Sequence, residues 1–303
     1  MTTFTKQLLQ IPSVDKDVLL EAWVFEPLGT GPFPLVVAGH GMTVIKDAGL
    51  HAFGERWATE GNYASIIFDY RYFGGSGGTP RNLVSLPKQR EDYEAVLRWA
   101  RLQPERFMNT RIVLMGSALS GLTVSQLAQD DPGLAGVMAH SPMLDGYGTA
   151  MSLGFNPRLI FWGCVDRLRG LLGLEPLFIK AIGHPSEFAF LNTPSSYPGF
   201  VAMFSQGDTP FSSAPNLINA GVLFEIMNAR PGRKLSDARC PVLVVATKDD
   251  DIIPAAIAAQ IAKSAPEKVT LVEVSGGHFD IMEGGQSFSA NIKAQLDFLQ
   301  RVR

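Results

Sequence analysis

The sequence predicts an α/β fold, in which helices flank a mostly parallel sheet. Short apolar runs alternate with longer amphipathic stretches, as strands and their crossover helices do. Hydrophobic residues make up 46% of the 303 residues and charged residues 18%, which excludes a disordered or fibrous protein. A formal net charge of -3 provides no basic surface for nucleic acid.

Each element is placed where a periodic run meets turn residues. Strands are predicted at residues 19–25, 35–38, 65–69, 111–115, 136–139, 242–246 and 269–274. Helices are predicted at residues 47–60, 88–102, 119–129, 255–264 and 287–301. Gly61 ends the first of these helices and Pro104 follows the second, because glycine and proline both interrupt helices.

The alternation stops for about a hundred residues, and this interruption predicts an inserted helical cap. We therefore expect an α/β core of residues 1–141 and 239–303, with a cap of residues 142–238 that forms a lid over the substrate pocket. The cap is rich in aromatic residues and methionine, which suit an adaptable apolar pocket.

The aromatic residues of this cap are either pocket lining or internal packing. Phe155 is one of the aromatic residues of the predicted cap. Four others, Phe161, Trp162, Phe178 and Phe204, are predicted to line the substrate pocket. The plainer interpretation is that most aromatic side chains of such a segment pack the cap helices together.

Residues 111–121 predict a sharp strand-to-helix turn of the kind that presents a catalytic nucleophile. Only a turn centred on position 118 has small residues, Gly116 and Ser120, on both sides, whereas centring on Ser117 or Ser120 introduces a bulky flank. Position 118 is Ala118, whose methyl group cannot attack a carbonyl. The plainer alternative is an ordinary strand–turn–helix without catalytic meaning.

Three aspartates follow one late predicted strand, and a histidine follows the last. The acids are Asp249, Asp250 and Asp251, and the histidine is His278. In the order nucleophile, acid, base, His278 is the candidate general base and Asp250 the acid that orients it. Asp145 is a weaker candidate acid. A turn histidine and a solvated acidic loop are the alternatives.

The first β–α turn of the core contributes a candidate oxyanion hole. It reads Gly-His-Gly-Met and follows the strand predicted at residues 35–38. Backbone N–H groups from this turn and from the residue after the nucleophile can together stabilise an oxyanion. The donors would be those of Met42 and Leu119, and His40 is expected to orient the loop.

Together these residues make the chain resemble the α/β-hydrolase superfamily along nearly its whole length. The segments FDYRYFGGSGG at residues 68–78 and GHFD at residues 277–280, with Pro80, Arg81 and Asp92, are similar to its dipeptidyl-peptidase-like and dienelactone-hydrolase-like branch. That branch includes thiohydrolases and polyketide transferases of fungal secondary metabolism. The resemblance implies a mostly parallel eight-stranded sheet, and it favours Asp250 as the acid from its spacing to Pro254.

The leading hypothesis is a serine-hydrolase-type enzyme acting on an ester or thioester of a hydrophobic, polyketide-like acyl group, by hydrolysis or acyl transfer. In this hypothesis Ala118 is an inactivating replacement of the nucleophile, and the chain is inactive or impaired. The competing hypothesis is a natural non-hydrolytic homologue, either a binding protein or a cyclisation or rearrangement catalyst that uses His278 as acid and base. A third is that Ser117 or Ser120 replaces the nucleophile.

The remaining features predict a cytoplasmic protein without cofactor or metal. No apolar run is suited to a signal peptide or a membrane span, and the two cysteines, Cys164 and Cys240, fit a reducing compartment. The expected partner is a small hydrophobic acyl compound. A homodimer that uses the cap is a further expectation.

Overall fold

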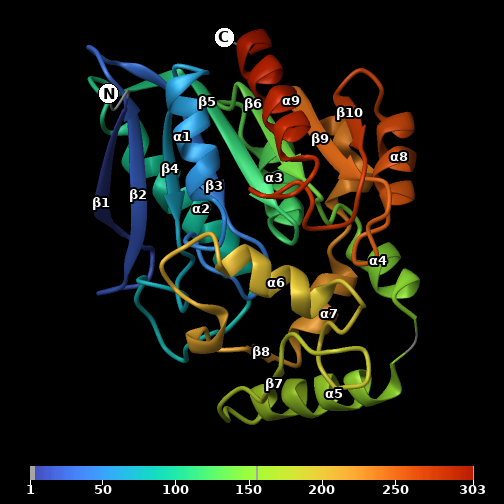
Figure 1. Ribbon diagram of the computed structural model, residues 1–303. Helices are drawn as coiled ribbons and strands as arrows, with labels where there is room; N and C mark the ends of the chain where they lie inside the picture. Colours follow the sequence, from blue (N-terminus) through green and yellow to red (C-terminus); the bar gives the residue numbers. More distant parts are fainter. Residues whose placement is uncertain (1–3, 155, 303) are drawn as a thin grey trace.

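The centre of the molecule is an eight-stranded sheet in the order β1-β2-β4-β3-β5-β6-β9-β10 (Figure 1). The computed structural model describes residues 4–154 and 156–302, so the predicted cap residue Phe155 lies outside the described residues. β2 runs antiparallel to both of its neighbours and all other pairs in this sheet are parallel, which confirms the predicted fold class. The strands are β1 (Phe4–Pro12), β2 (Leu19–Pro27), β3 (Phe33–Gly39), β4 (Ala64–Phe68), β5 (Phe107–Ser117), β6 (Gly136–His140), β9 (Val242–Thr247) and β10 (Val269–Val274).

The edge strand β1 is the one strand of this sheet that the sequence analysis did not predict. Its side chains are mostly exposed, and of the strand only Ile11 is buried. Its sequence mixes polar and apolar residues and has neither a buried run nor a clear alternation. Its pairing with β2 therefore depends on a contact that the local sequence does not encode.

Helices cover both faces of the sheet, as the alternation predicts. On one face α1 (His51–Thr59) contacts α9 (Phe288–Arg301). On the other face α2 (Leu86–Arg101) contacts α3 (Ser120–Asp130), and α8 (Ala255–Ser264) packs on β9 and β10. α1 begins later than predicted because residues 47–50 form a turn, with Gly49 at a φ of +82°.

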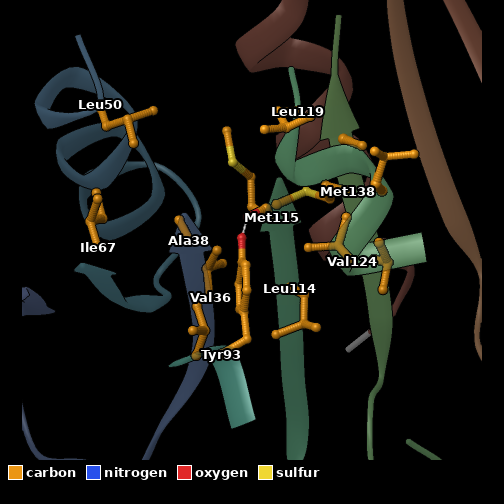
Figure 2. Packing of buried hydrophobic residues seen from close by; sticks show 14 of the residues in the cluster. Val36, Ala38, Leu50, Ile67, Tyr93, Leu114, Met115, Leu119, Val124 and Met138 are labelled. Carbon is orange, nitrogen blue, oxygen red and sulfur yellow. Dashed lines mark hydrogen bonds between the residues drawn. The ribbon is translucent and has the colours of Figure 1, made fainter. Parts of the chain in front are cut away.

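Figure 2 shows the part of the core around β3 and β5, the central strands of the sheet. Val36, Ala38, Leu114 and Met115 are fully buried there. Both faces of such a strand are covered, so its sequence reads as a continuous apolar run. The hydroxyl of Tyr93 donates a 2.6 Å hydrogen bond to the carbonyl oxygen of Met115, which satisfies a polar group in this apolar layer.

The chain between β6 and β9 leaves the main sheet and lies beyond the carboxyl ends of the parallel strands (Figure 1). It contains helices and a two-stranded antiparallel sheet, β7–β8, whose three-residue strands carry no periodic signal and were not predicted. Its elements are α4 (Gly146–Ser152), α5 (Pro157–Leu171), β7 (Phe178–Lys180), α6 (Ser196–Phe204), the 3-10 helix Phe211–Ser213, β8 (Leu217–Asn219), α7 (Val222–Asn228) and the 3-10 turns Pro231–Asp237.

The two ends of this segment are fastened to each other. The Gly146 N–H donates to the carbonyl oxygen of Ala229 at 2.9 Å, and the Gly232 N–H donates to that of Leu144 at 2.9 Å. A side chain on Gly146 would meet the Ile226 carbonyl oxygen at 1.9 Å, so only glycine permits this approach. The segment thus leaves the core and rejoins it at one place.

In the part of the chain that the structure describes, none of the helices combines the length and the apolar character needed to cross a bilayer.

Candidate active site

Position 118 occupies a tight turn between β5 and α3, and its backbone φ is +48°. This left-handed conformation costs a residue with a Cβ roughly 1–2 kcal/mol. Three hydrogen bonds hold it: the Ala118 N–H donates to the His140 carbonyl oxygen at 3.2 Å, and the Ala118 carbonyl oxygen accepts from the N–H of Gly121 at 3.0 Å and of Met143 at 2.9 Å. The turn therefore keeps the strained shape that projects the side chain of position 118 outward.

Close backbone packing explains the small residues around this turn. A Cβ on Gly116 would lie 2.8 Å from the Ser120 carbonyl oxygen, and one on Gly121 would lie 2.6 Å from Pro142 Cβ. A Cβ on Gly41 would lie 3.3 Å from the Ala118 methyl group, so the turn after β3 faces position 118. Gly116, one of the two predicted flanks, and Gly121 therefore stand where the backbone leaves no room for a side chain.

His278 and Asp250 form a buried pair. The Nδ1–H of His278 donates to Asp250 Oδ2 at 2.8 Å, and Asp250 Oδ1 accepts from the N–H groups of Ile252 and Ile253 at 2.9 and 2.7 Å. Burial by itself would raise the pKa of the Asp250 carboxyl, but the charge of His278 and these hydrogen bonds outweigh it and lower that pKa. Asp250 is therefore held as a carboxylate beside the imidazole.

The competing carboxylates are engaged elsewhere. Asp249 is exposed, and its neighbour Asp251 accepts from the N–H of Ser195 at 3.0 Å. Asp145 caps α4 and binds Arg230 and Arg233. Burial would raise the pKa of Asp145, but its bonds to Arg230, to the Gly148 N–H and to Arg233 lower it to about 2.

Two residues near position 118 have backbone N–H groups without a partner in the described structure. Met42 and Leu119 line the same cavity as Ala118 and His278. Among the described residues, neither the Met42 N–H nor the Leu119 N–H has a hydrogen-bond acceptor. Both N–H groups are therefore available to a ligand atom in the cavity.

A buried lysine anchors the loop that carries Met42. Lys46 Nζ binds Asp69 Oδ2 and Glu21 Oε1, both at 2.7 Å, and the Lys46 N–H donates to Asp69 Oδ1 at 2.7 Å. Burial by itself would lower the pKa of Lys46, but the charges of Asp69 and Glu21 and the hydrogen bonds to both carboxylates together outweigh it and raise that pKa. His40 lies in the same loop and accepts the Tyr70 N–H at Nε2, so it is a buried orienting residue.

A second histidine lies beside the turn, and a hydrogen-bond chain fixes its tautomer. The Trp57 Nε1–H donates to Gln295 Oε1 at 3.0 Å, which leaves Gln295 Nε2 to donate to Asn291 Oδ1 at 2.9 Å. Asn291 Nδ2 in turn donates to His140 Nδ1 at 3.2 Å. His140 therefore carries its proton on Nε2, which donates to Ser117 Oγ at 2.8 Å.

His140 stays neutral in this setting. Burial, with the charge of His278 as a smaller cause, lowers its pKa to about 3. Its Nε2 already bears a proton, so it is not a base for the Ser117 hydroxyl. The sequence analysis missed this histidine, although its position directly after a predicted strand was a usable signal.

The other serine of the turn is turned away from the cavity. Ser120 is fully buried, and its hydroxyl donates to the carbonyl oxygen of His40. The hydroxyl of Tyr70 lies 2.6 Å from Ser120 Oγ. Ser120 thus ties α3 to the loop after β3.

A cavity of about 190 Å³ opens at this site. Ala118 and His278 line it together with six of the chain's ten methionines. No Asp, Glu, Lys or Arg is found among the described residues of its wall. The methionines are Met42, Met143, Met151, Met203, Met227 and Met282.

None of the four predicted aromatic pocket residues is part of the described wall of this cavity. On α5, Leu159 and Ile160 reach the cavity, whereas Phe161 and Trp162 lie further around the helix and Phe161 is 59% exposed. The aromatic lining comes instead from Phe190, Phe200 and Phe279.

The other two predicted lining residues serve internal packing. Phe178 belongs to β7 and pairs with Asn219 of β8. Phe204 is buried, with its ring 5.5 Å from that of Phe211. Within the described part of the chain, no cluster of three or more His, Cys, Asp or Glu side chains is arranged to hold a metal ion.

Comparison with known proteins identifies relatives along the whole chain. A family model described as X-Pro dipeptidyl-peptidase (S15 family) matches residues 15–158. The quorum-quenching protein AidA of Acinetobacter baumannii is 31% identical over 298 residues, which cover 97% of this chain and 95% of that protein. The polyketide transferase ATR5 of Stachybotrys chlorohalonatus is 26% identical, with 100% and 99% of the two chains covered.

Solved structures share the fold. The structure of DcsB in complex with its substrate analogue has a TM-score of 0.79 at 19% identity, and the match covers 98% of this chain and 99% of that one. At 19% identity this structural likeness shows only a shared architecture. The protein that is 31% identical over nearly the whole chain shows common ancestry as well. The chain therefore belongs to the α/β-hydrolase superfamily.

Proposed function

We propose that this site is built for acyl transfer from an ester or thioester of an uncharged, hydrophobic acyl group to water or to an acceptor alcohol. Position 118 is the nucleophile position, His278 the general base, Asp250 its orienting acid, and Met42 and Leu119 the oxyanion donors. The strained φ of +48° at position 118 carries the proposal, because an ordinary strand–turn–helix has no need of it.

With a serine at position 118, the reaction has two steps. The hydroxyl oxygen attacks the carbonyl carbon while His278 Nε2 takes the hydroxyl proton, and the N–H groups of Met42 and Leu119 receive the oxyanion. The tetrahedral intermediate collapses and His278 returns the proton to the departing alcohol or thiol. Water or an acceptor alcohol then attacks the acyl-enzyme by the same route.

With Ala118 the first step has no nucleophile. The chain as it stands is expected to bind the acyl compound without covalent attack. Any remaining conversion would come from binding and oxyanion stabilisation. We propose that Ala118 replaces a nucleophile in an otherwise complete site.

The lining of the cavity supports the substrate class. A charged acyl group would lose its hydration there without gaining a partner, whereas methionine side chains adapt to an irregular apolar chain. Relatives named as polyketide transferases and thiohydrolases fit this class.

We further propose that residues 142–238 act as the lid of this cavity. Helix α6 contacts the loops of the site at two points: the N–H of Ser195, just before it, donates to Asp251 at 3.0 Å, and the Phe200 ring lies 5.5 Å from that of Phe279. Beyond α6, the Thr209 N–H donates to Asp47 at 2.8 Å. Movement of α6 would therefore displace the loops that carry Asp250, His278 and Met42 together.

The test is Ala118→Ser, assayed with aryl esters of short and long acyl chains and with a fluorophosphonate probe. We expect ester turnover to rise by on the order of 10³-fold or more and the probe to label position 118. Adding His278→Gln should abolish both effects, which controls for a change in binding alone. If Ala118→Ser neither turns over esters nor reacts with the probe, the proposal fails.

One observation favours a second candidate, in which His278 itself does acid–base chemistry on a bound compound. Its Nδ1 is held by Asp250, while no described side chain hydrogen-bonds to its Nε2. A proton could then move directly between Nε2 and the ligand. Full conversion of a native compound by the unaltered chain, lost in His278→Gln, would favour this candidate.

The alternative nucleophile Ser117 is tested with the same fluorophosphonate probe. Labelling of the unaltered chain that is lost in Ser117→Ala would identify Ser117 as the nucleophile.

A further inference from the structure

Helix α5 presents an apolar face to solvent. Phe161 is 59% exposed, Leu168 58% and Leu171 85%, and Leu172, directly after the helix, is 67% exposed. Cys164 is exposed on the same helix. These five residues are called the outer face of α5. Figure 1 shows the helix at the end of the molecule that is farthest from the main sheet.

The spacing of the five residues places them on one side of the helix. They recur at intervals of three or four residues, which is the period of a helical stripe. The buried residues of α5, Leu159, Gly163 and Asp166, lie on the opposite side. A surface helix usually turns its apolar side to the core, whereas α5 turns an apolar stripe to solvent. An exposed contiguous apolar patch of this kind marks an interaction surface.

The charged residues of α5 that flank the outer face are all arginines, and the acids nearest to them come from other segments: Glu225, which interacts with the charge of Arg167, and Glu175, whose carbonyl oxygen accepts from Arg169. Arg158 and Arg169 flank it on one side and Arg167 on the other, at 100° per residue. The one acidic residue of the helix, Asp166, is turned inward and accepts the N–H groups of Leu177 and Gly221, both at 2.6 Å. An apolar stripe between arginines results, on a chain whose net charge is -3.

We propose that the outer face of α5 binds the surface of an anionic lipid bilayer, with the helix lying in the interface. Leucine and phenylalanine side chains would enter the acyl boundary while the flanking arginines meet negative headgroups. A second copy of this chain on the same face would bring arginine against arginine, which disfavours a homodimer built there.

The cavity lining reaches the surface near the N-terminal end of α5. Met151, in the last turn of α4, and Leu153, directly after that helix, line the cavity and are 45% and 42% exposed. An apolar compound dissolved in the bilayer would thus meet the cavity mouth without crossing water. This last step rests on the proposed function, whereas bilayer binding does not and is measured without any substrate.

The full chain is mixed with vesicles of phosphatidylcholine, or of phosphatidylcholine and phosphatidylglycerol in equal parts, and bound protein is measured by flotation. We expect binding to the anionic vesicles that weakens as salt is added, and little binding to the neutral ones. Absence of binding to anionic vesicles at low salt would overturn the proposal, whatever the result with Ala118→Ser.

Matched variants locate the contact. Leu171→Ser with Leu172→Ser should weaken binding by more than about tenfold, whereas Leu102→Ser, at an 81% exposed leucine after α2, should leave it unchanged. Arg167→Gln should weaken it about fivefold, and Arg98→Gln on α2 should not. Unchanged thermal unfolding midpoints exclude misfolding as the cause.

Two results would contradict the assignment. Equal losses in the α5 variants and in the α2 controls would show binding through general surface properties. A dimer in light scattering that becomes a monomer in the Leu171→Ser, Leu172→Ser variant would show that a second copy occupies this face.

Discussion

At the scale of single residues, position 118 has the backbone conformation of a nucleophile turn but a side chain that cannot act as a nucleophile. The backbone there keeps the left-handed φ of +48°, and its neighbours are small enough for the turn to close. Alanine gains nothing from this conformation, because a methyl group has no reaction to perform. The cost of the turn is met by packing and by the bonds from Gly121 and Met143, which hold whichever side chain stands at this position.

Ala118→Gly should stabilise the protein. Glycine adopts a positive φ without the steric cost that Ala118 bears, although it gains more entropy on unfolding. We expect the free energy of unfolding to rise by about 0.5–1 kcal/mol, measured by urea denaturation. The control Ala259→Gly, inside α8, should lower it by about 1 kcal/mol. A loss of stability at both positions would mean that Ala118 is not strained.

At the scale of elements, Asp145 joins the two ends of the cap segment. It caps α4 through the Gly148 N–H at 2.9 Å, and it pairs with Arg230 and Arg233 at 2.9 and 2.7 Å, where the segment returns to the core. One carboxylate thus fixes the place where the chain leaves the core and the place where it comes back.

Asp145→Asn should destabilise the protein in a pH-dependent way. The pKa of Asp145 is lowered to about 2, so its pairing stabilises the fold above about pH 4 and is lost as the pH falls towards about 2. Asparagine keeps the helix cap but not the charge. Because Arg233 is half exposed, we expect a loss of only about 1 kcal/mol at neutral pH, by urea denaturation.

The control is Asp297→Asn, which removes an exposed pair with Lys293 and should cost less than about 0.5 kcal/mol. The difference between Asp145→Asn and the parent should shrink as the pH falls from about 4 to about 2. A difference that stays constant over this range would show that the arginine pairs do not contribute through charge.

At the scale of the whole molecule, the cavity is lined both by the loops that follow the strands of the main sheet and by the segment between β6 and β9, the proposed cap. The core supplies Met42, Ala118 and His278, and the cap segment supplies Phe200 and Met227. The described wall holds no charged side chain of Asp, Glu, Lys or Arg. A ligand is therefore selected by the absence of charge as much as by shape.

The cavity should discriminate strongly against charged acyl groups. In the Ala118→Ser variant, an ester of an unbranched acyl chain should have kcat/KM at least about 100-fold above that of an ester of equal length ending in a carboxylate, because a buried unpaired charge costs several kcal/mol. Equal values would mean that the acyl chain does not enter this cavity. Parallel assays with acetyl esters measure the rate of the reaction without a long acyl chain and so separate discrimination in the cavity from the rate of the chemical step.

Much of the core was predictable because its signals are local. The edge strand β10 was predicted at its observed bounds, because its β-branched residues and the turn residues that follow it are signals of the local sequence. The sharp turn between β5 and α3 at position 118 was predictable because its close backbone packing requires small residues at fixed spacing. β1 and the β7–β8 pair were not, because an exposed or very short strand is defined by its partner.

The sequence by itself determined the order of the core elements from β2 onwards, the register of the turn at position 118 and the pairing candidates Asp250 and His278. Apolar periodicity and backbone sterics act between near neighbours, so they can be read along the chain. The tertiary structure alone decided that Met203 and Phe200 line the cavity rather than Phe204, that His140 holds Ser117, and that the outer face of α5 is left uncovered. Those outcomes depend on which distant surfaces meet, and the local pattern of apolar residues is the same whether a face ends up buried or exposed.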